Sequence, residues 1–258
     1  MKSVKGILSD IDGTLYSKGS PVPGAIEAVE RLREKGIKLL FFTNTDSKTP
    51  KNVYKLLIEY GFNLKEEEIF TPIIALKEFF KDKPNVNLYL VTTEEVKEEF
   101  QEFHIVEGTE VPDYVIIGDF RDNWDVNRLN NAFRHVMKHK AILLGTQGNK
   151  YFLDVDGEPV IDSGSFVHMV ANAANVKPIV FGKPSKDYFL QALKKLILPP
   201  ENVIVVGDDI DTDILGAKSA NIRSYLVKTG KGQYFNQSKG SIMPSKIIES
   251  FASLIGLL

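Results

Sequence analysis

The chain has 258 residues, of which 43% are hydrophobic and 26% are charged, a composition typical of a globular protein with a sizeable core. Its formal net charge of −2 gives no electrostatic reason to expect nucleic acid or an anionic membrane surface as a partner. It contains no cysteine, which excludes disulfides, thiolate metal sites and a cysteine nucleophile. No apolar run approaches the roughly 18 residues of a membrane span and no signal peptide is evident, so we expect a cytoplasmic protein.

The beginning of the chain predicts a strand, a helix and a second strand. Residues 4–9 form a short apolar run, as expected for a buried strand. Apolar residues then recur at helical spacing after Pro23, and Gly36 ends the predicted helix. Residues 37–42 form an apolar run of the kind found in strands buried on both faces of a parallel sheet. This order predicts a βαβ unit.

The middle of the chain continues with alternating helical and strand patterns. They predict helices over residues 50–60, 72–81, 94–103, 126–139 and 163–174, and strands over residues 86–91, 114–117, 141–144 and 151–153. The series that begins after the sequence Lys83-Pro84-Asn85 is an α/β unit by itself and is large enough to form a separate module.

Three further strands are predicted towards the end of the chain, over residues 179–181, 202–206 and 224–227, with helices that end at Leu196 and Ala220. The first two of these strands are followed by polar residues. A final helix is predicted from Lys246. Together the elements indicate an α/β protein with a parallel sheet.

Chemically useful side chains follow the ends of four predicted strands. They are Asp10 and Asp12, Thr43 and Asn44, Lys183, and the acidic group Asp208, Asp209 and Asp213. Open α/β sheets bind ligands beyond the carboxyl ends of their strands, so these groups should meet at one site. Because that many carboxylates cannot all stay ionised at short range without cations, we expect a divalent cation. An oxygen donor set without cysteine favours Mg²⁺ over zinc or copper.

Each of these groups also has a simpler interpretation when it is taken alone. Two acids and a glycine after a strand are typical of a turn, and the polar run after residue 43 could cap a helix. Lys183 could be a solvated loop lysine. In the acidic group, N-capping is favoured for Asp211 and competes with a functional role for Asp213, while Asp209 could be structural. The occurrence of all four groups in order favours the functional interpretation.

The four groups resemble, in residue type and order, the motifs of the haloacid dehalogenase superfamily. The corresponding segments are Asp10-Ile11-Asp12-Gly13-Thr14, Thr43-Asn44, Lys183, and Gly207-Asp208 with Asp213. Together with Gly182-Lys183-Pro184-Ser185 and Val227-Lys228-Thr229-Gly230-Lys231, they look like subfamily IIA, the NagD-like phosphatases. Within it, the chain looks most similar to the branch that contains phospholysine phosphohistidine inorganic pyrophosphate phosphatase. Thr45 stands where many members have a second asparagine.

This resemblance implies a phosphatase that works through an aspartyl-phosphate. Asp10 would be the nucleophile, and Asp12 would protonate the leaving oxygen and later activate water. The side chains of Asp10 and Asp208 and the main-chain carbonyl of Asp12 would hold Mg²⁺. The second acid of the pair is not needed in dehalogenating relatives, so its presence favours phosphoryl transfer.

The resemblance also implies roles for the remaining motif residues. Thr43, Asn44 and Lys183 would bind the phosphate of the substrate. Asp213 would orient a metal-bound water or Lys183 without touching the metal. Asp209 would likewise lie behind the metal ligands, or it would have a purely structural role.

The spacing of the motifs locates an inserted module. Too few residues separate the first motif from the next helix for a domain, whereas the stretch from Thr43 to Lys183 is long enough. We therefore expect a Rossmann-like catalytic core formed by residues 1–82 and 179–258. Residues 83–178 should form an α/β cap, of type C2 in the resembling subfamily. Cap-mediated homodimers would be consistent with that subfamily.

Residues that could read the leaving group of the substrate follow two strands of the expected cap. They are Asp119, Asn123 and Trp124 after the strand at 114–117, and Gln147, Asn149 and Tyr151 after the strand at 141–144. Tryptophan more often packs than binds substrate, and residues 145–149 could form only a turn. NagD-like relatives usually have an asparagine and an aspartate in this second loop, so their substrate specificity does not transfer to this chain.

We expect the protein to be a Mg²⁺-dependent phosphatase of small phosphorylated metabolites. A phosphomutase or phosphotransferase acting on sugar phosphates is an alternative, which an inserted C2 cap disfavours. A protein that binds phosphorylated ligands without turnover is another, which the presence of both Asp10 and Asp12 disfavours. Sugar phosphates, nucleotides, pyridoxal phosphate, pyrophosphate and phosphoramidates are all compatible with the sequence.

Overall fold

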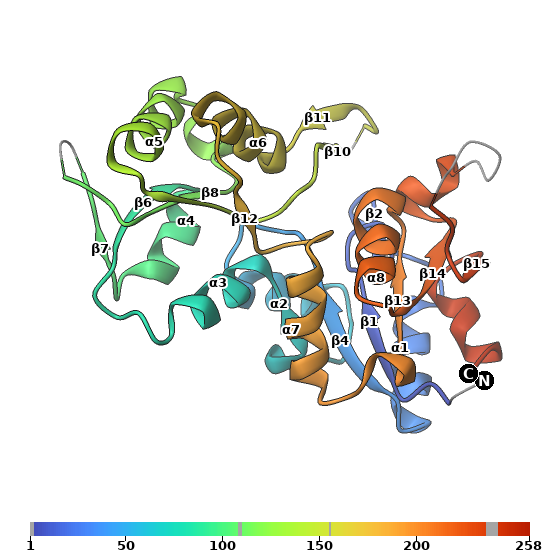
Figure 1. Ribbon diagram of the computed structural model, residues 1–258. Coiled ribbons are helices and arrows are strands. Elements are labelled where there is room, and N and C mark those ends of the chain that lie inside the picture. The colour runs from blue at the N-terminus through green and yellow to red at the C-terminus, as the bar shows by residue number, and fades with distance from the viewer. Residues whose placement is uncertain (1–2, 108–109, 155, 236–241) are drawn as a thin grey trace. The chain divides into compact units, whose positions relative to one another are not determined.

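The structure, a computed structural model, describes residues 3–107, 110–154, 156–235 and 242–258, and it divides into two compact units. Unit 1 consists of Met1–Thr43, Lys51–Phe70 and Lys183–Leu258, and unit 2 consists of Asn44–Pro50 and Thr71–Gly182. Each unit is organised around its own parallel sheet (Figure 1). The predicted α/β class with a parallel sheet is confirmed.

Unit 1 contains a six-stranded parallel sheet in the order β15-β14-β13-β1-β4-β5. Its strands are β1 (Gly6–Ser9), β4 (Lys38–Phe42), β5 (Ile69–Phe70), β13 (Val203–Gly207), β14 (Arg223–Val227) and β15 (Lys246–Ile248). A short antiparallel pair, β2 (Tyr16–Ser17) and β3 (Ser20–Pro21), follows β1. Every residue of β1 and β13 is buried, which explains why neither strand alternates polar and apolar residues.

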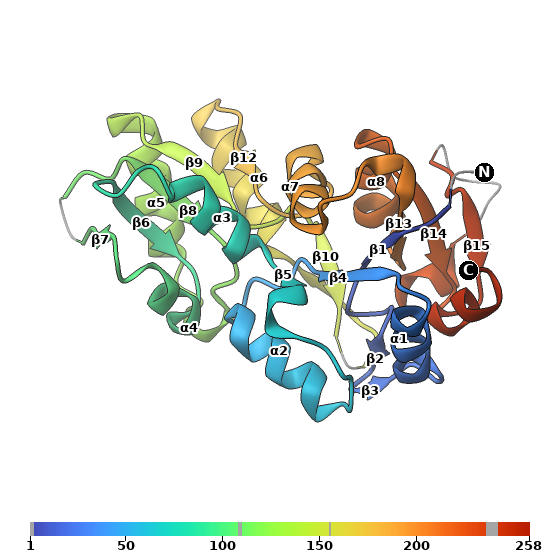
Figure 2. The same cartoon turned by 90° about the horizontal axis from the view of Figure 1, so that it is seen from below.

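Helices cover both faces of this sheet. They are α1 (Ala25–Glu34), α2 (Pro50–Glu59), α7 (Lys186–Leu196) and α8 (Leu215–Ser219). Figure 2 shows α7 and α8 on one face and α1 and α2 on the other. On the α1 side, Val29 and Leu32 share one buried cluster with Ile7 and Phe41 of the strands and Phe251 near the C-terminus. Burial of this kind stabilises helices that are too short to be stable alone.

Unit 2 contains a five-stranded parallel sheet in the order β12-β9-β8-β6-β7. Its strands are β6 (Asn87–Val91), β7 (His104–Ile105), β8 (Tyr114–Ile117), β9 (Ile142–Gly145) and β12 (Ile179–Val180), with a hairpin of β10 (Tyr151–Leu153) and β11 (Pro159–Ile161). Helices α5 (Val126–His139) and α6 (Ser163–Ala174) lie on one face, and α3 (Pro72–Phe80) and α4 (Glu94–Lys97) lie on the other (Figure 1). Leu129, Val136 and Val167 of α5 and α6 are buried with Val115 and Ile117 of β8.

The two compact units divide the chain at other places than the sequence led us to expect. Residues 71–82, expected in the core, lie in unit 2, where Phe79 and Phe80 of α3 contact the Tyr114 ring of β8. The segment Asn44–Pro50 also belongs to unit 2. Aromatic contacts hold α3 in unit 2 and hydrogen bonds hold the segment Asn44–Pro50 there, and periodicity along the chain reveals neither.

The helix predicted from Lys246 is wrong. Residues Lys246–Ile248 form β15, which pairs in parallel with β14, and a 3₁₀ segment over Phe251–Gly256 follows. Ile248, Phe251 and Leu254 are buried in the core of unit 1. Strand pairing and burial therefore override the local helical pattern of this segment.

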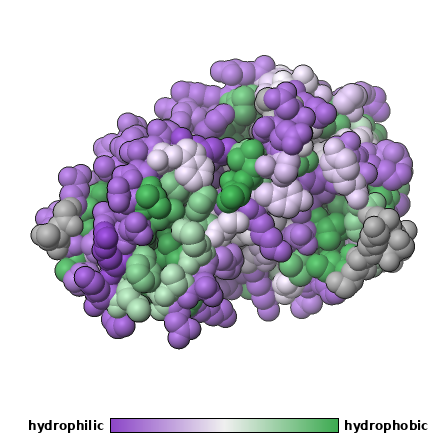
Figure 3. All heavy atoms as spheres, turned by 90° about the horizontal axis from the view of Figure 1, so that it is seen from above, coloured by the Kyte–Doolittle hydropathy of each residue, from purple (hydrophilic) through white to green (hydrophobic). Residues whose placement is uncertain are grey.

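No helix in the part of the chain that the structure describes is long and apolar enough to cross a membrane. Figure 3 looks onto the side of unit 2 formed by α5 and α6, where apolar side chains gather between hydrophilic ones. The exposed apolar side chains of these two helices include Val126 and Met137 of α5 and Met169 of α6. Exposed apolar residues are usual on protein surfaces and do not by themselves identify a docking face.

Replacement of Phe41 by alanine should destabilise unit 1. The Phe41 side chain is fully buried in β4, so its truncation leaves a cavity and should lower the free energy of unfolding by about 3–5 kcal/mol. Urea unfolding followed by circular dichroism measures the loss. Ile58→Ala in α2 is the control, because Ile58 is 41% exposed and its truncation should cost less than about 0.5 kcal/mol. Equal losses for the two variants would contradict this core.

Candidate active site

Three adjacent strands of unit 1 end at the same edge of the sheet and supply predicted site residues. The strand order β13-β1-β4 places Asp208, Asp10 and Thr43, which follow these strands, next to one another. Lys183 comes from the segment before α7. All four side chains are buried. The sheet topology thus brings together residues that are far apart in the sequence.

The Lys183 ammonium group joins two of the predicted acids. Its Nζ donates hydrogen bonds to Asp10 Oδ1 at 2.5 Å and to Asp213 Oδ1 at 2.6 Å. The same atom lies 4.9 Å from the centre of the Phe42 ring. Because all three charged groups are buried, removal of the Lys183 ammonium group would leave buried acids without their counter-charge, at a cost of about 3–5 kcal/mol. Lys183 is therefore a buried bridge and not a solvated loop lysine.

The other acids after β13 are fixed by the start of the next helix. Asp213 Oδ2 accepts a hydrogen bond from the main-chain N–H of Asp209 at 3.1 Å. Asp209 caps a π-helical turn over Ile210–Ile214, since its Oδ1 accepts from the N–H of Asp211 at 2.8 Å. Its Oδ2 binds Lys231 Nζ at 2.6 Å. The expectation that Asp211 is the N-cap is wrong, because the turn begins at Ile210 and Asp211 lies inside it.

Asp208 occupies a niche that glycine neighbours make possible. A Cβ atom on Gly13 would lie 2.2 Å from Asp208 Oδ2, and one on Gly230 would lie 2.1 Å from the same oxygen. Both glycines have positive φ angles, of +82° and +53°. The main-chain N–H of Lys231 donates to Asp208 Oδ2 at 2.7 Å. The backbone of two distant loops therefore encloses this carboxylate.

The two acids of the first motif have different surroundings. Asp10 is buried, and its Oδ2 accepts a hydrogen bond from Thr14 Oγ1 at 3.2 Å. Asp12 is exposed, on the turn that contains Gly13. Thr229 Oγ1 donates to the Gly13 carbonyl oxygen at 2.6 Å and so attaches this turn to the loop after β14. Different environments allow two carboxylates of one motif to take separate roles.

Tyr188 and Lys231 support the site, although our sequence interpretation gave neither of them a role. The buried Tyr188 hydroxyl lies 2.8 Å from the main-chain oxygen of Thr43 and 2.9 Å from that of Phe70. Lys231 binds two of the acids after β13, Asp208 through its main-chain N–H and Asp209 through its side chain. In the sequence, Tyr188 looks like any apolar helix residue, whereas the glycines that flank Lys231 could have indicated a close approach of the backbone.

Thr43 and Asn44 are adjacent in the sequence but belong to different units. The N–H of Thr43 donates to the carbonyl oxygen of Phe70 at 3.1 Å, within unit 1. The Asn44 side chain is bound within unit 2, where its Nδ2 donates to Asn149 Oδ1 at 2.9 Å. The division between the units therefore falls inside this motif.

Burial dominates the electrostatics of the acidic residues. Desolvation raises the pKa of Asp10 in spite of the Lys183 charge, and it raises the pKa of Asp208 well above its ordinary value, with a further contribution from the charge of Asp10. Burial also raises the pKa of Asp213 to about 7. Burial alone would lower the pKa of Lys183, but the two carboxylates that it binds raise the pKa above its ordinary value. One lysine does not compensate three buried acids, so an additional cation would stabilise their ionised forms.

The acids lie close enough together to hold a metal ion. One carboxylate oxygen each from Asp10, Asp208 and Asp213 lie within 4.8 Å of one another. Both oxygens of Asp213 and both oxygens of Asp10 also accept hydrogen bonds within the protein, so these bonds do not distinguish the two acids as ligands. The donors are all oxygens, as hard divalent cations require.

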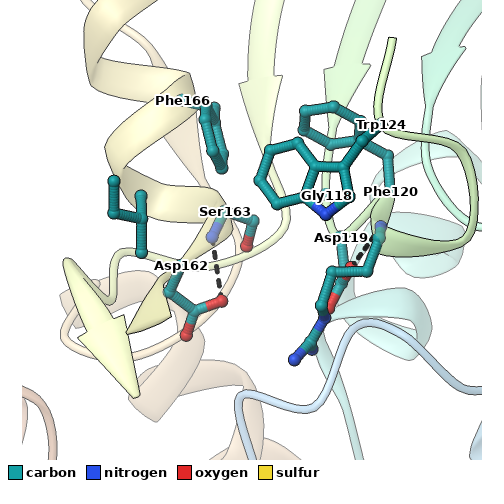
Figure 4. A pocket seen from close by; sticks show the side chains of 9 residues that line it. Gly118, Asp119, Phe120, Trp124, Asp162, Ser163 and Phe166 are labelled. Atoms are coloured by element: carbon teal, nitrogen blue, oxygen red, sulfur yellow. Dashed lines mark hydrogen bonds and ion pairs between the residues drawn. The ribbon is translucent and has the colours of Figure 1, made fainter. Parts of the chain in front are cut away.

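Unit 2 has a pocket of its own. Its lining residues are Gly118, Asp119, Phe120, Arg121, Trp124, Ile161, Asp162, Ser163 and Phe166. Figure 4 shows Trp124 and Phe166 next to each other, with their ring centres 5.1 Å apart, and Asp162 and Ser163 below them. Asp119 is buried and forms an ion pair with Arg121. Two of the six cap candidates from the sequence, Asp119 and Trp124, thus line a pocket with aromatic and charged walls.

The four other cap candidates do not line this pocket. Gln147 is buried, and its Nε2 donates to Ser163 Oγ at 2.6 Å. Asn149 Nδ2 donates to a carboxylate oxygen of Asp162 at 3.2 Å, so Gln147 and Asn149 both take part in hydrogen bonds within unit 2. Asn123 and Tyr151 are exposed.

A parallel sheet whose strand ends bring together an acid pair, a buried lysine and further acids defines the class of haloacid dehalogenase-like hydrolases. Two family models match the chain. The model described as haloacid dehalogenase-like hydrolase matches residues 7–106, and a second model, for HAD-like hydrolases, matches residues 180–254.

Known phosphatases resemble the chain over nearly its whole length. It is 31% identical to phospholysine phosphohistidine inorganic pyrophosphate phosphatase of Xenopus laevis over 261 residues, which covers 99% of the chain and 94% of the relative. The p-nitrophenyl phosphatase from Archaeoglobus fulgidus superposes with a TM-score of 0.91 and 26% identity, covering 99% of this chain and 100% of that one. NagD from E. coli K-12 gives a TM-score of 0.84 and 26% identity, with coverages of 97% and 98%.

The chain belongs to the haloacid dehalogenase superfamily, subfamily IIA, and is a phosphatase of that family. The family membership that the four sequence motifs implied is confirmed.

Gly13→Ala should inactivate the site. A Cβ atom at this position would lie 2.2 Å from Asp208 Oδ2 and would displace that carboxylate, so hydrolysis of p-nitrophenyl phosphate should fall by about 100-fold. Gly19→Ala is the matched control, because Gly19 also has a positive φ, of +72°, but a Cβ atom there would meet nothing within 4 Å. It should carry the backbone strain alone and keep most of its activity. Equal activities of the two variants would contradict the described niche.

Proposed function

We propose that the protein is a Mg²⁺-dependent phosphatase that hydrolyses small phosphorylated metabolites through an aspartyl-phosphate on Asp10. The observation that carries this proposal is the buried contact of Lys183 with Asp10 and Asp213, next to Asp208. Relatives named as phosphatases of phosphoramidates and pyrophosphate and of p-nitrophenyl phosphate support hydrolysis of a bond to phosphorus. A sequence without cysteine fits action in the cytoplasm.

The first step is attack by a carboxylate oxygen of Asp10 on the phosphorus of the substrate. The bond between phosphorus and the leaving oxygen breaks, and Asp12 gives its proton to that oxygen. The Lys183 charge favours the ionised, nucleophilic form of Asp10, because it offsets part of the desolvation that raises the pKa of this carboxyl. Asp12, with its exposed side chain, is able to exchange protons with solvent.

The second step releases the enzyme. Asp12, now ionised, takes a proton from water, and the water oxygen attacks the phosphorus of the aspartyl-phosphate. The bond between phosphorus and the Asp10 oxygen breaks, which gives inorganic phosphate and the free carboxylate. One acid therefore serves in turn as proton donor and proton acceptor.

The carboxylates of Asp10 and Asp208 and the main-chain oxygen of Asp12 would hold the Mg²⁺ ion. When bound, the ion supplies positive charge to the phosphate oxygens and to the acids around it. Asp213 would keep Lys183 in place, since it accepts a hydrogen bond from the same ammonium group that binds Asp10. Asp209 would position Asp213 through its main-chain N–H and Lys231 through its side chain.

Thr43, Asn44 and Lys183 would bind the phosphate oxygens. Tyr188 supports this role of Thr43, because its hydroxyl donates to the Thr43 main-chain oxygen and so fixes the backbone of Thr43 directly after β4. Preorganised donors of this kind stabilise the charge that develops in phosphoryl transfer without being reoriented during the reaction.

Unit 2, which we equate with the cap domain of the family, would recognise the leaving group of the substrate. Asp119 and Trp124 are the favoured candidates among those from the sequence, because they line its pocket. Asn123 and Tyr151 are exposed and could contact a larger substrate.

Asp10→Asn should abolish turnover. An amide is not a nucleophile, so phosphate release from p-nitrophenyl phosphate in the presence of Mg²⁺ should fall by about 10³-fold or more. Removal of divalent cations with a chelator should have a comparable effect on the unmodified protein, and re-addition of Mg²⁺ should restore activity. Acid quenching during turnover should trap protein-bound phosphate on the unmodified protein and none on Asp10→Asn.

Asp211→Asn is the control for this experiment, since Asp211 is an exposed acid near the site to which we give no role in the reaction. Its activity should stay within about twofold of that of the unmodified protein. Undiminished turnover by Asp10→Asn, or full activity without a divalent cation, would overturn the mechanism.

Trp124→Ala should change the preference among substrates. If Trp124 contacts the leaving group, kcat/KM for aryl phosphates should fall by roughly 10-fold, while kcat/KM for a small substrate such as acetyl phosphate should change little. The nearby Val126→Ala is the control, because Val126 is 66% exposed and does not line the pocket. Equal losses on both substrates would contradict a role of Trp124 in specificity.

A further inference from the structure

The segment Asn44–Pro50 follows the catalytic strand β4 in the chain but is bound into unit 2. Ser47 accepts a hydrogen bond at its main-chain oxygen from Thr93 Oγ1 at 3.1 Å. The N–H of Thr49 donates to Glu95 Oε1 at 2.6 Å. The polar groups of unit 2 therefore determine where this segment lies.

Asp46 is buried in the middle of this segment. Its Oδ2 accepts hydrogen bonds from Thr146 Oγ1 at 2.5 Å and from Ser163 Oγ at 2.7 Å. Thr146 and Ser163 are buried as well, and Gln147 Nε2 donates to Ser163 Oγ. A carboxylate in such a connected network is strongly tied to one arrangement of its partners, because each unmade hydrogen bond would cost free energy in the interior.

A second chain of hydrogen bonds starts at Asn44. Its Nδ2 donates to Asn149 Oδ1, and Asn149 Nδ2 donates to Asp162 Oδ2. Asp162 is the N-cap of α6, and its Oδ1 accepts from the N–H of Ser163 at 2.8 Å. The chains from Asn44 and from Asp46 thus meet at Asp162 and Ser163, which also line the pocket of unit 2.

We propose that Asp46 is a positioning residue that fixes Asn44 for the binding of the substrate phosphate by tying the segment to Thr146 and Ser163. The inference rests on the proposed function, which assigns a phosphate oxygen to Asn44. Asp46 itself touches no reacting atom and acts through Asn44. Because the same network forms part of the pocket wall, the phosphate-binding group and the pocket of unit 2 are coupled.

Charged groups on several elements face Asp46. Burial, together with the charges of Asp162 and Asp119, raises the pKa of Asp46 to about 7, although the hydrogen bonds from Thr146 and Ser163 act to lower it. Asp162 comes from the start of α6 and Asp119 from the loop after β8. Arg121 adds a positive charge to this cluster and pairs with Asp119.

A double-mutant cycle tests whether Asp46 acts through Asn44. Asp46→Ala removes the acceptor for both hydroxyls and should lower kcat/KM for p-nitrophenyl phosphate by roughly 10- to 100-fold. Asn44→Ala should give a similar loss. In the Asn44→Ala background, Asp46→Ala should cause less than about a threefold further loss, because the group it positions is already absent. Independent, multiplicative losses would overturn the proposal.

Hydrogen exchange gives a reading that does not depend on activity. In Asp46→Ala, the amides of segment 44–50 should exchange faster, while those of β4 should stay protected. Asp156→Asn, a change of an exposed acid in the β10–β11 turn of the same unit, should alter neither. Unchanged exchange of segment 44–50 would overturn the present inference, whereas full activity of Asn44→Ala would contradict only the phosphate-binding role given to Asn44 above.

Asp46→Asn should retain function and change the pH dependence of stability. Asparagine keeps an acceptor oxygen for Thr146 and Ser163, so most of kcat/KM should be preserved. In the folded protein the pKa of Asp46 is about 7, whereas in the unfolded chain it is near the ordinary value of 3.8. As the pH rises from 3.8 to about 7, the unfolded chain therefore loses this proton first, and the contribution of Asp46 to the stability of the folded protein falls. The variant cannot lose this proton. Its melting temperature relative to that of the unmodified protein should therefore rise from pH 5 to pH 8, and a constant difference would overturn the assigned network.

Discussion

The bridge that Lys183 forms between Asp10 and Asp213 is the interaction on which the active site depends. Three charged groups are buried together, and burial alone would drive the carboxylates towards their neutral forms. The ammonium group opposes this tendency, while Asp208 adds negative charge that it cannot offset. The resulting excess of negative charge suits a divalent cation, whose positive charge would favour the ionised forms of these acids.

Backbone geometry, more than side-chain packing, gives this charge cluster its shape. The order β13-β1-β4 sets Asp208, Asp10 and Thr43 next to one another, and positive φ angles at Gly13 and Gly230 let two loops approach the Asp208 carboxylate. The loop after β14 closes the arrangement through hydrogen bonds to Asp208 and to the turn after β1. Small residues are required here because a Cβ atom would occupy the space of the carboxylate.

The division between the two compact units falls inside the Thr43-Asn44 motif, so the two residues are held by different surroundings. Thr43 is held by the backbone of β5 and by Tyr188, whereas the Asn44 side chain is bound to Asn149, which in turn binds Asp162 at the start of α6. The polar network around Asp46 is buried and connected, so small changes in the pocket of unit 2 would be felt at Asn44.

The sequence by itself determined the α/β class, most of the central strands and the family, because buried parallel strands appear as apolar runs and their functional residues follow them directly. It also identified Asp10, Asp208 and Lys183, whose proximity the structure describes. Only the tertiary structure decided that Asp209 and not Asp211 caps the acidic turn, that Lys246–Ile248 is a strand, and that Tyr188 and Lys231 support the site. It alone assigned Asn44 to unit 2. Each of these features depends on hydrogen bonds or burial between segments far apart in the chain, and such contacts leave no periodic trace in the local sequence.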